Sequence, residues 1–526
     1  MQSKLRVVII KPSKYDVDGY VERFRWGFMP NSTVPHMRSL TPAACDDVTI
    51  ETHSVDEYVH TDLDYLSLLE RRDGVNTLVA LAGVQSHQFH RALDLAAYAV
   101  KFGCHTVIGG PHPMTCDTSE CWADGVSFAL AEGELIWGTI IRDAIDGQLR
   151  PIYGLGGRWQ HELTSPVIAP PAEADLRRYV VPMLGLYPAR GCPFSCTFCS
   201  VIKIAGRRIR SQSVATTIDS LKAATAAGVR VVMFTSDNFN KYPDAEELLN
   251  TIIAEKINIR IMAQCDAQVN RQEDLVALMA RAGCHHMFVG MESFNKETLK
   301  AVHKNQNKPE MYQRIADLCR ENGIDAHFSN IIGFPNDTRE TIAEHLDTLI
   351  DIGPTWASFY ILCPIPGTEQ YEDFQKEGLI TERNLDRFDT TALTWDHPNL
   401  MGPQMRAELF GCYKRFYSAR HVTRIARGIK PGSRLSGSLG LIAGAAFQRL
   451  CAAQGTHPMS GGIKRVRLDS NRDYLRLRRN KYGFELASLP SNLALAQVDQ
   501  DFSRQTNPAH RSSEERPVSL ALPIST

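Results

Sequence analysis

Three cysteines stand close together in the string GCPFSCTFCS, with the spacing C-x3-C-x2-C. Cys192, Cys196 and Cys199 place three thiols in one short loop, and cysteine thiolates are the usual ligands of iron–sulfur clusters. A zinc site would need four ligands, often as two C-x2-C pairs, and no second pair follows nearby. An odd number of cysteines also argues against disulfide pairing. The spacing predicts a [4Fe–4S] cluster whose fourth iron has no ligand from this motif and is open to an exogenous molecule.

The residues around this loop indicate where it lies in the fold. Met183–Tyr187 (MLGLY) is a short apolar run, and prolines and glycines follow it, which is typical of a strand leading into a loop. With Phe198 directly before the last cysteine, the motif resembles that of the radical S-adenosylmethionine (SAM) superfamily. The resemblance implies an α/β barrel in which SAM binds the open iron. It also implies reductive cleavage of SAM to methionine and a 5′-deoxyadenosyl radical.

Length and composition limit the class of protein. The 526 residues suffice for two or three domains, and 43% hydrophobic with 22% charged residues is typical of a soluble protein. A net charge of −1 gives no reason to expect nucleic acid or an anionic membrane as a partner of the whole chain. The start has no signal-peptide pattern, and glycine, serine and arginine interrupt the apolar stretch 435–453, so we expect no transmembrane segment. Thirteen cysteines in such a chain favour a cytoplasmic protein with free thiols.

The first part of the chain alternates apolar runs with a helical pattern. Arg6–Ile10, Thr77–Val84 and His105–Gly110 predict buried parallel strands, and His90–Phe102 predicts a helix that ends at Gly103. This pattern indicates a Rossmann-like, doubly wound α/β domain. Such domains bind ligands at the carboxyl ends of their strands.

Two loop strings in this part support a second resemblance. VIGGPHP (Val107–Pro113) and AEGE (Ala131–Glu134) are similar to loops of the cobalamin-binding domain found in many radical SAM enzymes. The motif D-x-H-x-x-G, which supplies a cobalt ligand in other cobalamin proteins, is absent, so His87 and His112 are interpreted mainly as hydrogen-bonding or packing residues. A vestigial domain with empty loops is the alternative. The resemblance implies cobalamin contacts at Gln85, Ser86, Gly109, Gly110, Pro111, His112, Glu132, Gly133 and Glu134.

The second part of the chain repeats a strand–helix pattern, which predicts a partial TIM-type barrel with its active site at the carboxyl ends of the strands. The radical SAM resemblance assigns SAM contacts at these strand ends. For each such residue a helix N-cap is the alternative, as Ser293 with Asn295 illustrates. The implied SAM contacts are Phe198, Ser236, Asp237, Asn238, Glu292, Ser293 and Gly333.

Composition shifts divide the chain into five parts. The Arg207–Arg210 run is interpreted as an ion-paired or solvated surface, because no aromatic platform for nucleic acid accompanies it. Trp395, His397, Tyr413 and Tyr417 are candidate pocket residues, most of them expected in the core. The predicted parts are the cobalamin-binding domain (1–150), a linker (151–182), the radical SAM barrel (183–390), a helical C-terminal region (391–495) and a disordered tail (496–526).

Together the two resemblances imply a cobalamin-dependent radical SAM enzyme that methylates an unactivated carbon of a biosynthetic intermediate. Its partners would be a small-molecule substrate and an electron donor such as flavodoxin or ferredoxin. The alternatives are oxidative cyclisation or rearrangement without methyl transfer, and a non-catalytic cobalamin or redox sensor. The sequence does not define the substrate, so lipid, antibiotic precursor, tetrapyrrole and peptide stay open, and no general acid or base can be named.

Overall fold

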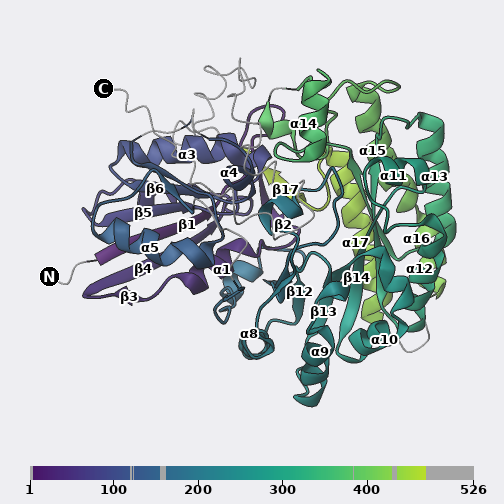
Figure 1. Cartoon of the computed structure of the whole chain (residues 1–526), viewed down its shortest axis with the longest axis horizontal. Coiled ribbons are helices and arrows are strands. Elements are labelled where there is room, and N and C mark those ends of the chain that lie inside the picture. Colours follow the sequence, from purple (N-terminus) through teal and green to yellow (C-terminus); the bar gives the residue numbers. More distant parts are fainter. Residues whose placement is uncertain are drawn as a thin grey trace, which may run out of the picture.

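The structure is a computed structural model that describes residues 4–118, 121, 124–154, 162–382, 384–428 and 435–468. The predicted disordered tail (496–526) and the part of the C-terminal region from 469 to 495 lie outside the described residues. Two β-sheets, each covered by helices, lie side by side (Figure 1). Within the described residues, no helix has the length and hydropathy needed to span a membrane.

The first sheet is built around β1 (Lys4–Lys11), whose apolar run RVVII is almost completely buried. The chain passes from β1 to β4 (Val48–Asp56) on one side and then to β5 (Asn76–Leu81) on the other, so the strand order reverses at β1. This reversal is the point at which doubly wound sheets bind their ligands. The strand order is β3-β4-β1-β5-β6-β7-β8, and all strands are parallel except β3 (Ala44–Cys45). The strands after β5 are β6 (His105–Gly109), β7 (Val126–Ala129) and β8 (Ile152–Tyr153).

Helices cover both faces of this sheet because alternate residues of β1 point to opposite sides. Val8 and Ile10 pack with α3 (Phe89–Lys101), whereas Val7 and Ile9 pack with α1 (Thr33–Leu40) and α5 (Gly133–Ile145). Burial of both faces explains why β1 is a continuous apolar run without polar alternation. The predicted doubly wound α/β domain is confirmed.

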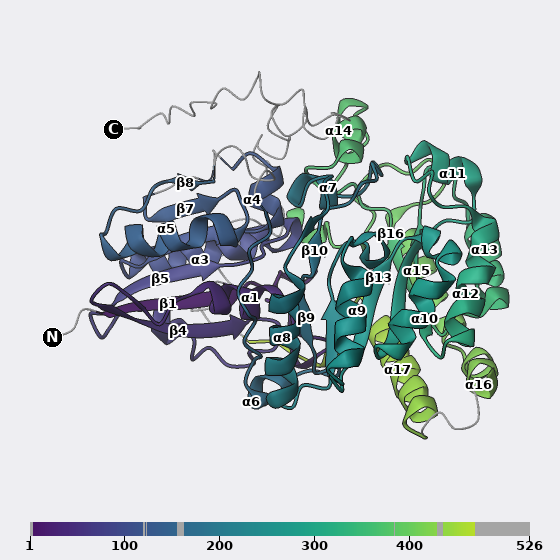
Figure 2. The same cartoon turned by 60° about the horizontal axis from the view of Figure 1, so that its bottom comes forward.

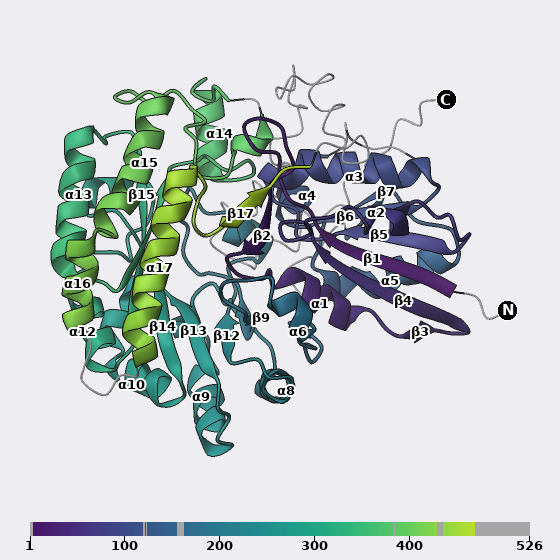
Figure 3. The same ribbon diagram turned by 180° about the vertical axis from the view of Figure 1, so that it is seen from behind.

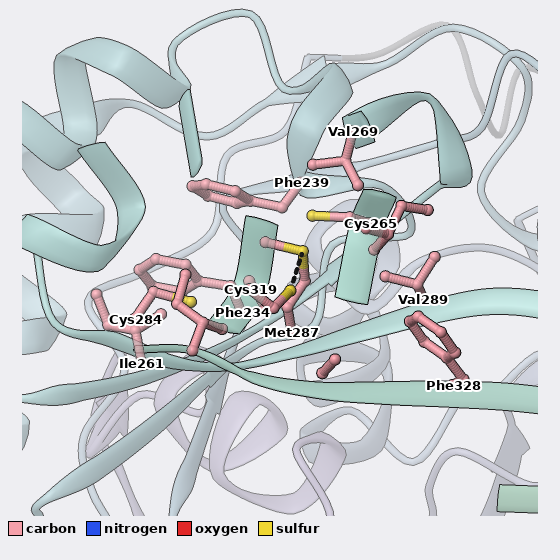
Figure 4. Packing of buried hydrophobic residues seen from close by; sticks show 14 of the residues in the cluster. Phe234, Phe239, Ile261, Cys265, Val269, Cys284, Met287, Val289, Cys319 and Phe328 are labelled. Atoms are coloured by element: carbon pink, nitrogen blue, oxygen red, sulfur yellow. Dashed lines mark hydrogen bonds between the residues drawn. The ribbon is translucent and has the colours of Figure 1, made fainter. Parts of the chain in front are cut away.

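The second sheet has six parallel strands that pair in sequence order, from β9 to β16. Helices cover its outer face (Figure 2), and buried apolar side chains and thiols such as Cys265, Cys284 and Cys319 fill the space between (Figure 4). These cysteines are therefore core residues. The strands are β9 (Leu184–Leu186), β12 (Val231–Phe234), β13 (Arg260–Cys265), β14 (Cys284–Glu292), β15 (Asp325–Ile332) and β16 (Trp356–Ile361). The covering helices are α8 (Val214–Ala226), α9 (Ala245–Ala254), α10 (Glu273–Arg281), α12 (Tyr312–Glu321), α13 (Arg339–Ile352) and α15 (Gly402–Phe416).

The structure adds three features to the sequence-based description. β8 lies in the predicted linker but pairs with β7, so the first sheet extends past residue 150. β4 was not predicted because its sequence VTIETHSVD is rich in polar residues, as suits a strand near the sheet edge. After the helices α16 (Ala419–Gly428) and α17 (Leu435–Gln454), β17 (Gly462–Val466) pairs with β2 (Arg23–Gly27), so the C-terminal region returns to the first part of the chain (Figure 3).

Candidate active site

The three motif cysteines lie in the loop between β10 (Ala189–Arg190) and α7 (Val201–Ile204). Backbone hydrogen bonds hold this loop to other parts of the chain. Cys192 N donates to Gly206 O (3.1 Å), and Thr197 N donates to Val302 O (3.1 Å). Its position at the carboxyl ends of the barrel strands agrees with the predicted strand-then-loop pattern.

The motif cysteines are partly or fully buried in their loop. Burial raises the pKa of Cys192 to about 11 and, together with the neighbouring thiolates, raises the pKa of Cys199 further. Without a cation these thiols stay protonated, so binding of a metal cluster would displace their protons. No three His, Cys, Asp or Glu side chains of the described ranges converge on a single-ion site. A [4Fe–4S] cluster binds each thiolate through a different iron, so the motif cysteines fit such a cluster without meeting at one point.

Two polar side chains from other loops of the barrel contact the cysteine loop. Asn238 Nδ2 lies 3.0 Å from Cys192 Sγ, and Gln306 Nε2 lies 3.5 Å from Cys196 Sγ. Amide groups of this kind stabilise thiolates by hydrogen bonding, which is one way in which a protein tunes an iron–sulfur cluster. Asn238 was predicted as a SAM contact, whereas Gln306 was missed because no sequence pattern connects it with the motif.

Lys304 brings a buried positive charge to the same place. Its Nζ lies 2.7 Å from Glu292 Oε1 and 5.7 Å from the centre of the Phe198 ring. Burial alone would lower the pKa of Lys304, but the negative charge of Glu292 raises it above its usual range. Lys304 therefore stays charged beside the cluster loop. The sequence analysis missed it because a single lysine after a helix carries no motif.

Glu292 has an unusual backbone conformation. Its φ is +67°, which is rare for residues other than glycine, and the pairing of β14 with β15 shifts register between Gly290 and Glu292. Such a bulge turns a side chain out of the regular strand alternation. Here it directs the Glu292 carboxylate toward Lys304, and Ser329 Oγ also lies 3.4 Å from that carboxylate. Strained backbone of this kind is concentrated at functional sites.

The other predicted SAM contacts lie around the same strand ends, but their side chains have partners in the chain. Ser236 Oγ accepts a hydrogen bond from Ala189 N (3.0 Å), and Asp237 Oδ2 accepts one from Gly191 N (2.9 Å). Ser293 Oγ accepts one from Asn295 N (3.0 Å). These side chains thus secure the cysteine loop and the start of α11 (Lys296–Ala301), and their contact with SAM stays a prediction.

Gly333 begins a turn that a buried carboxylate organises. Its φ of +81° suits glycine, and Asp337 Oδ2 accepts hydrogen bonds from Gly333 N (2.8 Å) and Phe334 N (3.0 Å). Burial raises the pKa of Asp337 to about 6, although these two bonds oppose the shift. The folded state therefore holds the proton of Asp337 more tightly than the unfolded state does.

We expect the Asp337→Asn variant to be more stable than the wild type at pH 7, by about 1–2 kcal/mol after allowance for solvent screening. The free energy of unfolding of the wild type falls relative to that of the variant as the pH rises from about 4 through 6. The reason is that Asp337 must then ionise in a half-buried place. Urea unfolding across this pH range measures the effect. Asp219→Asn, at an exposed position of α8, is the control and should leave the pH profile unchanged. Parallel profiles for the wild type and the Asp337 variant would contradict the prediction.

A cavity of about 270 Å³ lies at the carboxyl ends of the first sheet, between α1 and α5. Nine of its 26 lining residues are glycine or alanine, and at these positions the backbone itself faces the space. Gly110 has a φ of +136°, and a Cβ at this position would collide with Val84 N. Only glycine fits there. The glycine and alanine residues of the wall are Ala80, Ala82, Gly83, Gly109, Gly110, Ala129, Ala131, Gly133 and Ala205.

Charged side chains line the same cavity where the two sheets meet. Arg190, at the cysteine loop, lies 2.9 Å from Glu134 and 3.2 Å from Glu132. Glu132 also accepts two hydrogen bonds from the buried Arg210 (2.6 and 2.8 Å), and Glu134 contacts His36 Nε2 (2.7 Å). Burial alone would raise the pKa of Glu134, but Arg190 and His36 lower it far below its usual range. The predicted cobalamin contacts Glu132 and Glu134 thus form a buried ion network between the sheets, and the prediction of ion pairing is confirmed for Arg210.

A second cavity, of about 590 Å³, opens between the carboxyl ends of both sheets. It shares Pro111, Ile204 and Thr235 with the first cavity, so the two spaces are neighbours. From the first sheet it is lined by the loop that includes Gln85 and Ser86. From the barrel and the C-terminal region its lining includes Met233, Tyr360, Asp389 and His457, none of which was predicted as a site residue. The rings of Tyr360 and His457 stack at 4.6 Å, which joins β16 to a loop about a hundred residues later.

The two loop histidines have different surroundings. His112 is 1% exposed, its ring lies 4.2 Å from that of Phe89, and it lines neither cavity. Its Nδ1 lies 3.1 Å from Ser86 Oγ. This favours the packing interpretation over contact with a group in the cavities. His87 lines the second cavity, and burial lowers its pKa to about 3, so it is neutral at pH 7. Trp395, His397, Tyr413 and Tyr417 are buried and line neither cavity, as expected of core residues.

Comparison with known proteins identifies the second part of the chain. Residues 186–349, which include the cysteine loop and β12 to β15, match the radical SAM superfamily. The chain contains a radical SAM domain. Such a domain uses a [4Fe–4S] cluster and SAM, and the cysteine loop, Glu292 and Lys304 lie within the matched residues.

The regions beside the radical SAM domain also have counterparts. The chain is 26% identical over 356 residues to the bacteriochlorophyllide d C-8(2)-methyltransferase of Chlorobaculum tepidum, covering 64% of this chain and 76% of the relative. The solved structure of TsrM from Kitasatospora setae, a radical SAM methyltransferase with cobalamin and a [4Fe–4S] cluster bound, matches with a TM-score of 0.61 and 17% identity over 86% of this chain and all of that one. The cobalamin-dependent radical SAM enzyme OxsB matches with a TM-score of 0.57 and 13% identity over 95% of this chain and 78% of that one. The fold is thus that of a Rossmann-like domain followed by a radical SAM barrel.

Proposed function

We propose that this protein is a cobalamin-dependent radical SAM enzyme that methylates an unactivated carbon of a biosynthetic intermediate. The observation that carries the proposal is the position of the two cavities. They adjoin each other between the two sheets, at the carboxyl ends of the parallel strands, and the second sheet carries the cysteine loop. The similarity to a named methyltransferase over 64% of the chain supports methyl transfer as the reaction.

The first cavity fits part of a cobalamin. Its small-residue wall leaves a narrow apolar space where a flat group can approach the backbone closely. Among the described lining residues of this cavity, the only histidine is His36, and its Nε2 is paired with Glu134. This agrees with the absence of a D-x-H-x-x-G motif and with a cobalamin held without a histidine from that motif. When bound, cobalamin supplies a methyl group that a carbon radical can capture.

Residues of the chain supply position and charge around these spaces. Lys304 and Glu292 hold opposite charges beside the cysteine loop, and the ion network of Arg190 and Arg210 fixes that loop against the first sheet. The second cavity has room for a substrate between Tyr360, Met233 and the loops of the first sheet. We include in the proposal a small-molecule substrate, a cytoplasmic location and an electron donor such as flavodoxin or ferredoxin. The exposure of Pro193 and Arg208 near Cys192 would give a donor access.

The test uses the anaerobically reconstituted full chain with SAM, cobalamin and a strong reductant. The proposed function predicts release of methionine and 5′-deoxyadenosine. It also predicts that the product of a supplied candidate intermediate is heavier by one methyl group. This methyl group should carry the isotope label when the methyl group of SAM is labelled. Product of altered connectivity without the added methyl would favour cyclisation or rearrangement. A protein that binds cluster and cobalamin but never cleaves SAM would favour the sensor.

Filling the first cavity should remove cobalamin without removing the cluster. We expect Ala82→Phe, at a buried position of the small-residue wall, to lower cobalamin affinity by about a hundredfold, since a large side chain would occupy the space. Cobalamin retained after gel filtration and iron bound per chain measure the two effects separately. Leu135→Phe, at an exposed position of α5, is the matched control. Full cobalamin retention by the Ala82 variant would show that this cavity is not the cobalamin site.

A further inference from the structure

The near-neutral charge of the whole chain conceals a strongly basic segment. Residues 409–468 contain eleven Lys and Arg residues and no Asp or Glu. In the structure this segment includes the end of α15 and all of α16 and α17, and α16 packs against α17. Figure 3 shows α17 in front of the barrel strands with α16 beside it. Arg465 and Arg467 lie at the end of the segment and pair with Asp16, so the basic charge that remains on α15, α16 and α17 is carried by the residues named below.

Helix α17 is apolar on its outward face as well as its inward face. Leu441, Ala445 and Cys451 are buried against the protein, and Gly444 lets the helix approach Trp356 closely. On the opposite side Leu439 is 56% exposed, Ile442 is 53% exposed and Leu450 is 39% exposed. A surface helix normally carries polar residues on its outward face. The exposed apolar residues of this face are Leu439, Ile442, Ala443, Ala446, Leu450 and Ala453.

Exposed basic side chains accompany this apolar face. Arg420, Arg424 and Arg427 project from α16, and Lys414 and Arg449 lie on α15 and α17. Within the part of the chain that the structure describes, no carboxylate forms an ion pair with any of these five, whereas the neighbouring Arg415 pairs with Asp347 of α13. We call the exposed apolar face of α17 together with these five basic residues the α16–α17 surface.

We propose that the α16–α17 surface docks on an anionic lipid bilayer. An apolar helix face flanked by arginine and lysine is the pattern that binds at the membrane interface, where the apolar side chains enter the acyl boundary and the basic ones meet the headgroups. Charge argues against the other occupants. A second copy would present the same positive surface, and residues 469–526 carry eight basic and seven acidic residues, too balanced to complement it. The proposal does not depend on the methyl-transfer reaction.

The experiment is sedimentation of the full chain with vesicles of phosphatidylcholine alone or mixed with phosphatidylglycerol, at low and high salt. We expect binding to the mixed vesicles only, and its loss at high salt. The variant Arg420→Glu/Arg427→Glu should bind at least about tenfold more weakly, because each basic residue near an anionic surface contributes roughly fivefold. Leu439→Ser/Ile442→Ser should also bind more weakly, because it removes the two most exposed apolar side chains of this surface.

Matched controls change the same chemistry on the first domain. Arg38→Glu/Arg142→Glu shifts the net charge equally from exposed positions of α1 and α5, and Leu135→Ser removes an exposed leucine. These controls should bind as the wild type does. Equal binding to both vesicle types, or no sedimentation at all, would overturn the proposal. Light scattering also tests for a dimer of the wild type that the Leu439→Ser/Ile442→Ser variant does not form. Such a dimer would contradict bilayer docking and show that the surface binds a second copy of the chain. Unchanged circular dichroism in all variants excludes misfolding as the cause of weaker binding.

Discussion

Replacing Cys192, Cys196 and Cys199 together by alanine is expected to abolish iron binding and every SAM-dependent reaction of the protein. The three thiols are the only cysteines of the C-x3-C-x2-C motif, and a cluster of this type binds its irons through thiolates. Iron and sulfide should fall from about four of each per chain to near zero after anaerobic reconstitution. Release of 5′-deoxyadenosine should fall below detection at the same time. Iron analysis, absorbance and electron paramagnetic resonance measure the loss.

The control removes two thiols that lie outside the motif. Cys45 and Cys121 are half-buried cysteines of the first domain, and Cys45→Ala/Cys121→Ala should bind iron as the wild type does. Cobalamin retention by the motif variant should stay near the wild-type level, because the first cavity is formed mainly by the other domain. A motif variant that still holds about four irons would refute both the cluster site and the function built on it.

Breaking the buried ion network is expected to give the largest loss of stability. Arg210 has no exposed side-chain surface, and Glu132 contacts both it and Arg190. Glu132→Ala would leave Arg210 buried without this partner, which typically costs about 3–5 kcal/mol. Because Glu132 lies in the first domain and Arg210 lies beside Arg190 of β10, the variant should also weaken the contact between the two parts of the chain. Urea unfolding measures the first effect, and proteolysis near residue 154 measures the second.

Two further variants test whether the stability loss comes from leaving a buried charge without its partner. Arg208→Ala removes an exposed arginine whose partner Glu162 is also exposed, and such pairs contribute only about 0–1 kcal/mol. Glu132→Met/Arg210→Met removes both members of the buried pair and should recover much of the stability that Glu132→Ala loses. If Glu132→Ala unfolds at the same urea concentration as Arg208→Ala, the network does not stabilise the fold.

The cluster motif and several of the strands could be predicted because both are local patterns. Cys192, Cys196 and Cys199 lie within a single loop, and apolar runs such as Arg6–Ile10 and Val231–Phe234 are read from a few neighbouring residues. The fold class, the cofactors and the enzyme class follow from these patterns, and the comparisons support them. Polar strands escape this reasoning, as β4 does, because partial exposure near a sheet edge removes the apolar pattern.

The site was predicted less completely than the fold. Glycines such as Gly110 were identified because a close approach of backbone leaves no choice of residue. For Glu132 and Glu134 the motif gave the position but not the partners, and the ion network with Arg190 and Arg210 appears only in the structure. The individual contacts with SAM and cobalamin, and the domain boundaries, stay predictions.

The sequence by itself determined the chemistry: three neighbouring thiols, followed by strand ends in order, specify a cluster at the mouth of a barrel. Only the tertiary structure decided which charges meet there. Arg210 and Glu132 are 78 residues apart, and Lys304 and His457 reach the active-site region from later loops. Such contacts depend on how whole elements pack, and the sequence around each residue carries no signal of its distant partner. The apolar outward face of α17 is a further case, since one face of a helix can be called exposed only when its other face is known to be buried.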